Sequence, residues 1–81
     1  MDYDVIEARY VEGYIVWLRF RDGTAGEIDL AGELWGDVFE PLKDFAFFRQ
    51  FRICEPGRTL EWPNGADLAP EFLHDNVKAT A

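Results

Sequence analysis

Residues 5–30, VIEARYVEGYIVWLRFRDGTAGEIDL, decide the fold of this chain. They hold three runs rich in β-branched and aromatic residues, which are Val5–Val11, Tyr14–Phe20 and Thr24–Leu30. Turn signals separate the runs, Glu12-Gly13 first and Asp22-Gly23 second. An Asp-Gly pair between two such runs is a strong hairpin signal, because glycine adopts the positive φ that a tight turn requires. The stretch therefore predicts an antiparallel three-stranded meander.

Alternation along these runs predicts which side chains meet the core. One face would carry the apolar set Ile6, Ala8, Tyr10, Val16, Leu18, Phe20, Ile28 and Leu30. The other face would carry a charged, water-facing set: Glu7, Arg9, Arg19, Arg21, Glu27 and Asp29. Trp17 and Ile15 fall on the charged face, which is unusual for apolar residues. Two interpretations stay open for Trp17: a partial second core covered by the terminal helix or by a second copy, or an exposed patch that contacts a partner.

Beyond the meander, the sequence predicts helical turns. Glycine and proline interrupt Ala31–Gly36 and Val38–Leu42, so each is expected to form one helical turn at most. Asp44 is expected to cap a short helix at Phe45–Gln50 that covers the apolar face of the sheet. Trp35, in the irregular segment, is interpreted as a plug for the open end of the sheet.

The last third of the chain predicts a second hairpin and a final helix. The hairpin strands would be Phe51–Cys54 and Thr59–Trp62, joined through Pro56-Gly57 in a type II turn. Pro70 would open a helix that ends near Asn76, since proline suits the first helical position. The tail Val77–Ala81 is expected to fray.

These elements predict one α+β domain over residues 1–81, ordered over about 5–76. Its architecture would be a three-stranded antiparallel meander and a second short β-hairpin, covered by short helices. With 48% hydrophobic and 16% aromatic residues, the chain is too apolar to be disordered.

Charge excludes further classes of protein. The 81 residues include 16 acidic and 8 basic ones, which gives a formal charge of −8. Such an excess repels phosphates, so no nucleic-acid partner is expected. The local basic stripe Lys43, Arg49, Arg52 and Arg58 is interpreted as balancing the acidic sheet or a symmetric second copy. No apolar stretch approaches the roughly 20 residues of a membrane span, and we expect a cytoplasmic protein without a membrane partner.

Residues that carry catalysis or bind metals are sparse. The chain has no serine, and its only cysteine and only histidine, Cys54 and His74, stand 20 positions apart. Cys54 is interpreted as a small core residue. Glu71 and His74 share the spacing of one metal-binding pair, but zinc needs at least three good ligands. His74 is therefore interpreted as a helix-surface histidine, and no enzyme activity, metal or cofactor is expected. Glu27 and Asp29 are expected to form solvated ion pairs with Arg9 and Arg19.

The segment Trp62-Pro63-Asn64-Gly65-Ala66-Asp67 combines a large aromatic, a rigid proline, a turn pair and a carboxylate. In a structural interpretation, Trp62 covers the core, Asn64 and Gly65 turn the chain, and Asp67 accepts backbone N–H groups at the start of the last helix. In a functional interpretation, the loop recognises a partner, with Trp62 as a flat anchor and Asp67 as an acceptor.

Several motifs in order resemble the small bacterial proteins called domain of unknown function 2442. They are Phe20-Arg21-Asp22-Gly23, Glu27-Ile28-Asp29-Leu30, Phe39-Glu40-Pro41-Leu42, Phe48, and the run from Thr59 to Pro70. The resemblance covers nearly the whole chain and implies an α+β fold with no established activity. It also implies that some relatives are antitoxin-like members of small two-protein operons, whereas others precede a helix-turn-helix DNA-binding domain.

We therefore expect a non-catalytic protein–protein interaction module, antitoxin-like or an adaptor. Its partner would be a small toxin-like protein or a second copy, and its contact residues would be Trp17, Arg19, Trp62, Asn64 and Asp67. The alternative is a small-ligand-binding or regulatory domain related to modules fused to helix-turn-helix domains.

Overall fold

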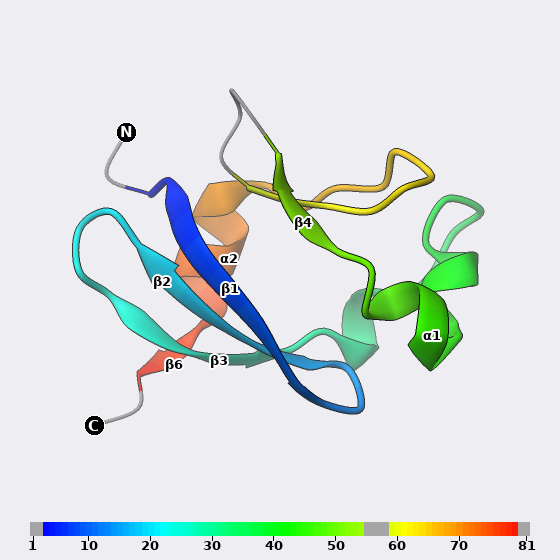
Figure 1. The fold of residues 1–81 in the computed structure, drawn as a ribbon, viewed down its shortest axis with the longest axis horizontal. Coiled ribbons are helices and arrows are strands. Elements are labelled where there is room, and N and C mark those ends of the chain that lie inside the picture. The colour runs from blue at the N-terminus through cyan, green and yellow to red at the C-terminus, as the bar shows by residue number, and fades with distance from the viewer. Residues whose placement is uncertain (1–2, 55–58, 80–81) are drawn as a thin grey trace.

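The predicted meander forms the main sheet of the computed structural model, which describes residues 3–54 and 59–79 (Figure 1). Its strands are β1 Val5–Glu12, β2 Ile15–Phe20 and β3 Ala25–Asp29, paired antiparallel in that order. Both connecting turns hold a glycine at positive φ, Gly13 at 52° and Gly23 at 93°. The predicted α+β class and meander are thus confirmed.

At the start of β1, the side chains that point to the core differ from the predicted ones. Register shifts interrupt the β1–β2 pairing between Val5 and Glu7 and again between Tyr10 and Glu12. Because an inserted residue reverses the alternation, Val5 is fully buried and Ile6 is 44% exposed. The assignment of Ile6 to the core face was wrong, whereas Ala8 and Tyr10 do pack against the core.

Short helices follow β3, as predicted. They are the 3₁₀ turns η1 Ala31–Glu33 and η2 Glu40–Lys43 and the single α-helical turn α1 Phe45–Phe48. The Asp44 side chain accepts a hydrogen bond from the Ala46 N–H at 2.9 Å, which confirms the predicted cap. Phe48 enters the core, so α1 closes one end of the molecule.

The second hairpin pairs β4 Arg52–Cys54 with β5 Thr59–Glu61, antiparallel as predicted. The predicted type II turn at 55–58 lies outside the described residues. Leu60 on β5 is fully buried, and the hairpin faces the meander across the core (Figure 1).

The C-terminal region is more ordered than the sequence indicated. Helix α2 runs over Pro70–Asn76 as predicted, and Val77 after it packs against the core. Strand β6, Lys78–Ala79, then pairs antiparallel with β3 and extends the sheet to the order β1-β2-β3-β6. The expected fraying was wrong for residues 77–79, because the Val77 N–H donates to the Leu73 carbonyl and residues 78–79 pair with the open edge of β3. Residues 80–81 lie outside the described part.

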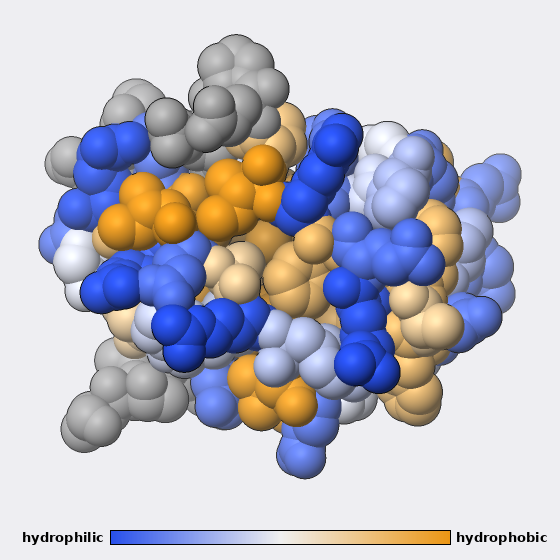
Figure 2. All heavy atoms as spheres, viewed as in Figure 1, coloured by the Kyte–Doolittle hydropathy of each residue, from blue (hydrophilic) through white to orange (hydrophobic). Residues whose placement is uncertain are grey.

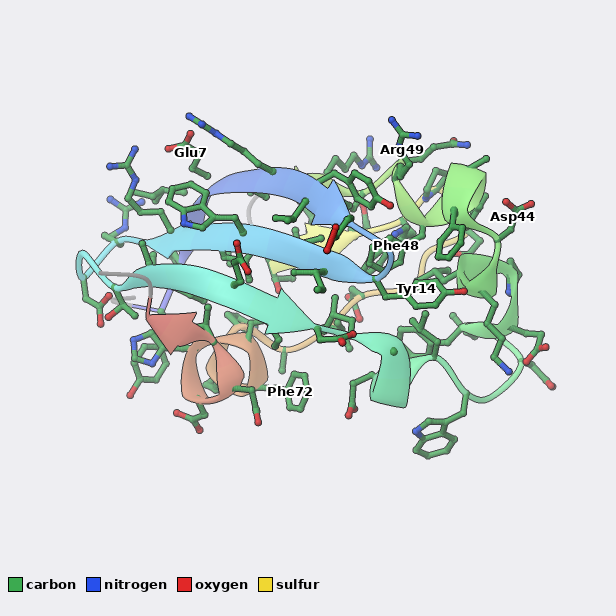
Figure 3. The ribbon with its side chains drawn as sticks, turned by 90° about the horizontal axis from the view of Figure 1, so that it is seen from below. Glu7, Tyr14, Asp44, Phe48, Arg49 and Phe72 are labelled. Carbon is green, nitrogen blue, oxygen red and sulfur yellow. The ribbon has the colours of Figure 1, made fainter. Side chains whose placement is uncertain are left out.

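One hydrophobic core fills the space between the sheet, the hairpin, α1 and α2. Its fully buried side chains include the aromatics Phe20, Phe48 and Trp62, with Leu73 from α2. Helix α2 therefore lies on the same side of the sheet as the hairpin and leaves the opposite side of β1 and β2 uncovered (Figures 1 and 3).

Candidate functional site

We call the uncovered side of the meander the outer face. Strand alternation decides which side chains point to it. Val16, Leu18 and Phe20 of β2 are fully buried. The alternate residues of the same strand, Ile15, Trp17 and Arg19, therefore point away from the core. Figure 3 looks onto this face from the side opposite to the β4–β5 hairpin. Because Leu73 anchors α2 on the core side, the interpretation that the terminal helix covers Trp17 was wrong.

Trp17 lies between two arginines on neighbouring positions of the sheet. The Arg9 guanidinium carbon is 5.4 Å from the centre of the Trp17 ring, and that of Arg19 is 5.9 Å away. Both distances are within cation–π range. Glu7 ties the two arginines together, since its carboxylate accepts from Arg9 Nε at 2.9 Å and also from Arg19. We call Glu7, Arg9, Trp17 and Arg19 the Arg–Trp ladder.

The other carboxylates of the outer face do not pair with these arginines. Arg9 and Arg19 bond Glu7 instead of Glu27 or Asp29, so the predicted pairing was wrong. Asp29 turns its side chain to the backbone, where it accepts from the Ala31 N–H at 2.9 Å and holds the start of η1. Glu27 stands opposite Trp17 on β3. The outer face is thus cationic over β1 and β2 and acidic over β3.

Hydrogen bonds from Arg19 and Arg9 hold the pKa of Glu7 below its ordinary value of 4.5. A group with a lowered folded-state pKa stabilises the fold above its unfolded pKa and loses that contribution as pH falls through the folded pKa. We expect Glu7→Gln to flatten the acid limb of the stability curve. Urea denaturation from about pH 3 to about pH 7 measures it, with Glu12→Gln, an exposed carboxylate on the same strand, as control. If the free energy of unfolding of E7Q fell with pH in parallel with that of wild type, the pairing of Glu7 with the two arginines would be contradicted.

The loop from Trp62 to Asp67 follows the structural interpretation at its first residue. Trp62 is 1% exposed, and its indole N–H donates to the Phe48 carbonyl at 2.8 Å. The ring packs between Phe48 and Phe51, with centroids 5.8 and 6.4 Å away. A side chain buried in this way offers no face to a partner, so the anchor interpretation of Trp62 does not fit its position.

Asn64 and Asp67 lie at the surface, each in a different setting. Asn64 Oδ1 accepts from the Ala66 N–H at 3.1 Å, and Gly65 has φ 89°, so the predicted turn is present. Asn64 Nδ2 also donates 2.8 Å to the Val38 carbonyl and thereby ties the loop to the segment after η1. Asp67 forms an isolated antiparallel bridge with Glu61. Helix α2 has Ala69 at its N-cap and no side-chain cap, so the predicted capping by Asp67 was wrong.

Trp35 does not plug the sheet. It is 72% exposed, whereas its neighbour Leu34 is 3% exposed and occupies the core position. The other large apolar residues at the surface are Ile6, Val11, Val38 and Phe45, from 41% to 53% exposed within the described part of the chain. Hydrophilic side chains interrupt the apolar ones on the face shown in Figure 2. Trp35 is the most exposed of these residues.

His74 is a partly buried residue with partners rather than a free surface histidine. Its Nε2 lies 2.8 Å from Asp22 Oδ2, and its ring stacks on Tyr3 at 4.3 Å and meets the edge of Phe20 at 5.0 Å. The Thr24 backbone N–H, with help from His74, holds the pKa of Asp22 below its ordinary 3.8. These contacts fasten α2 to the turn between β2 and β3. Sequence reasoning missed the pair because its members are 52 positions apart.

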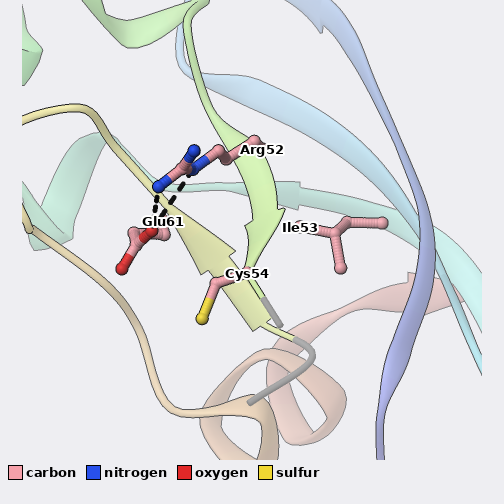
Figure 4. A pocket seen from close by; sticks show the side chains of 4 residues that line it. All are labelled: Arg52, Ile53, Cys54 and Glu61. Atoms are coloured by element: carbon pink, nitrogen blue, oxygen red, sulfur yellow. Dashed lines mark hydrogen bonds and ion pairs between the residues drawn. The ribbon is translucent and has the colours of Figure 1, made fainter. Parts of the chain in front are cut away.

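Cys54 lines an open pocket with Arg52, Ile53 and Glu61 on the β4–β5 hairpin (Figure 4). It is half-buried rather than in the core, so the core interpretation of this residue was wrong. Arg52 Nη2 and Glu61 Oε1 are 2.9 Å apart, so the two charges in the pocket satisfy each other.

Two residues of the predicted basic stripe, Lys43 and Arg52, form ion pairs in the structure. Lys43 pairs with Glu40 at 3.2 Å, Arg52 pairs with Glu61, and Arg49 lies 4.9 Å from the centre of the Tyr10 ring. Arg58 lies outside the described residues. The carboxylates that pair with Lys43 and Arg52 lie in η2 and β5, so these two residues do not balance the charge of the acidic sheet as predicted.

The described residues contain neither a candidate metal centre nor a candidate membrane-spanning helix. Within 3–54 and 59–79, no three His, Cys, Asp or Glu side chains are grouped as a metal site. In that same part of the chain, no helix has the length and apolar character to cross a membrane.

Comparison with known proteins identifies the family. No curated protein and no solved structure matches the chain. The family model described as "Protein of unknown function (DUF2442)" matches residues 5–79, nearly the whole length of the chain. The chain therefore belongs to the DUF2442 family.

Proposed function

We propose that this protein is a non-catalytic protein–protein interaction module, antitoxin-like or an adaptor, that binds its partner through the outer face of the meander. The observation that carries the proposal is Trp17, held between Arg9 and Arg19 on an uncovered sheet. A small toxin-like protein encoded in the same operon is the partner we favour, and a cytoplasmic location belongs to the proposal.

The Arg–Trp ladder has the composition of an interface centre. Tryptophan and arginine are enriched among the residues that dominate binding energies. The side chains of Arg9 and Arg19 are 70% and 50% exposed, so both guanidinium groups remain accessible beside the indole. Stacking and the shared Glu7 hold these long side chains in place, which lowers the entropy lost on binding.

Charge supports a protein partner over a nucleic acid. The ladder has two arginines and one glutamate, and β3 adds Glu27 and Asp29 to the same face. Phosphate binding needs a cationic surface, whereas a mixed-sign face suits a protein whose charges alternate in the same way. Complementary charges of this kind raise association rates and reject wrong partners.

Affinity capture with the tagged chain, followed by titration calorimetry with the captured protein, tests the proposal. We expect Trp17→Ala to weaken binding by about 2 kcal/mol or more, the range of interface hot spots, and Arg19→Ala by a smaller amount. Arg49→Ala is the matched control, because Arg49 also stacks on an aromatic ring, Tyr10, away from the ladder. Equal affinities for W17A, R49A and wild type, with the fold intact by circular dichroism, would refute the outer face as the site.

A further inference from the structure

We propose that Trp35 is an anchor for a basic segment of a protein partner, on a second surface that shares no residue with the Arg–Trp ladder. We call residues 33–38 the Trp35 arm. Trp35 is the most exposed of the large apolar residues in the described chain, at 72%. Exposing an indole to water is unfavourable, and burying it in a partner's pocket recovers that free energy.

The Trp35 arm is held from both ends. Before Trp35, Leu34 is buried, and the Asp29 carboxylate bonds the Ala31 N–H at the start of η1. After Trp35, Gly36 has φ 91°, and its carbonyl accepts from the N–H groups of Phe39 and Glu40 at 3.1 and 2.9 Å. The backbone that carries the indole is thus fixed by hydrogen bonds on both sides. Binding therefore orders few additional backbone groups and loses little conformational entropy.

Asn64 gives the arm its long-range support. Its side-chain amide donates to the Val38 carbonyl, 26 positions earlier in the chain. The Trp62–Asp67 loop therefore braces the arm, and the two segments lie together at one end of the molecule (Figure 1). The predicted recognition loop contains Trp62, but its hydrogen bond from Asn64 holds the segment that carries Trp35.

The charge around Trp35 selects the partner. Residues 31–40 contain Glu33, Asp37 and Glu40 and no basic residue. Glu40 pairs with Lys43, whereas neither Glu33 nor Asp37 forms an ion pair within residues 3–54 and 59–79. Two carboxylates that flank Trp35 in the sequence, Glu33 half-buried and Asp37 exposed, favour a partner pocket with a lysine- or arginine-rich rim. A second copy fits poorly, because its own arm repeats the same negative charge and the chain carries −8 overall.

Site-specific photo-crosslinking tests this inference on the full chain. Trp35→benzoylphenylalanine places a reactive aromatic probe on the arm, and Phe45→benzoylphenylalanine, at a 53% exposed aromatic position on α1 outside both the arm and the ladder, is the control. After irradiation in a lysate of the source cell, mass spectrometry identifies the linked peptide. We expect an adduct specific to position 35 whose partner peptide carries an excess of lysine and arginine.

Binding of the identified partner then measures the contribution of each group. We expect Trp35→Ala to raise Kd at least about 30-fold, the equivalent of a hot spot, and Glu33→Gln with Asp37→Asn to reduce the salt dependence of Kd. Because Trp35 is exposed, W35A is expected to keep the wild-type melting temperature within a few degrees.

Three results would overturn the inference: no adduct above the Phe45 control, a linked peptide that is neutral or acidic, or a link to a second copy. The W17A variant separates this inference from the proposed function. If a protein binds in a Trp17-dependent way while position 35 gives no adduct, the outer face stands and the Trp35 anchor fails.

Discussion

Replacing Trp62 by alanine is expected to remove a large part of the free energy of unfolding of this protein. Large-to-small changes of a buried aromatic cost about 3–5 kcal/mol, and domains of this size have total stabilities near 5–15 kcal/mol. Trp62 is 1% exposed, contacts Phe48 and Phe51, and satisfies the Phe48 carbonyl through its indole N–H. Its loss therefore creates a cavity and leaves a carbonyl without its donor.

Urea denaturation followed by circular dichroism measures this effect. Trp62→Phe should lie between wild type and W62A, because it retains an aromatic ring but loses the hydrogen bond to Phe48, which is worth about 1–3 kcal/mol when buried. Trp35→Ala is the matched control, with the same change at a residue that is 72% exposed. If W62A and W35A unfolded at the same urea concentration, the assignment of Trp62 to the core would be refuted.

The second large effect is expected for Leu73→Ala in α2. Leu73 is fully buried, and the loss of a buried leucine side chain costs about 2–5 kcal/mol. Helix α2 has seven residues, too few to be stable without packing. We therefore expect L73A to loosen α2 and, with it, the β3–β6 pairing that follows.

Hydrogen exchange resolved by residue distinguishes this local effect from global unfolding. In L73A, the amide protons of residues 73–79 are expected to exchange faster than those of β2. Asp75→Ala, an exposed change in the same helix, controls for altered helix propensity. Wild-type stability of L73A, or exchange unchanged over 73–79, would show that α2 and β6 are not integral to the fold.

Local signals predicted much of this fold. Turn glycines and strand alternation were sufficient to place β1, β2 and β3, since Gly13 and Gly23 adopt the positive φ that their turns demand. Asp44 and Pro70 marked the starts of α1 and α2 for similarly local reasons.

The errors arose where the outcome depended on distant parts of the chain. The register shift at the start of β1 is set by pairing with β2, so alternation alone misplaced Ile6. Strand β6 has two residues and no pattern of its own, and only the free edge of β3 orders it. The contact of His74 with Asp22 likewise joins α2 to a turn in the meander.

The candidate surfaces were predicted in part. Trp17 and Arg19 lie on the charged face as expected, but the bridge through Glu7 and Arg9 needed the strand register. Trp62 lies in the core, as its structural interpretation predicted, whereas Trp35, interpreted as a plug for the sheet, is exposed. Both stand beside glycine or proline in irregular segments, and sequence could not show that Leu34 rather than Trp35 fills the core.

Recognition through the outer face is tested most directly by the nuclear magnetic resonance footprint of the captured partner on the isotope-labelled chain. We predict that the largest amide and side-chain shifts fall on Arg9, Ile15, Trp17, Arg19 and Glu27, including the Trp17 indole N–H. The buried Trp62 indole N–H should remain unchanged in the same spectrum. A footprint confined to the β4–β5 hairpin and its pocket at Cys54, with the Trp17 indole N–H unmoved, would contradict the proposed function.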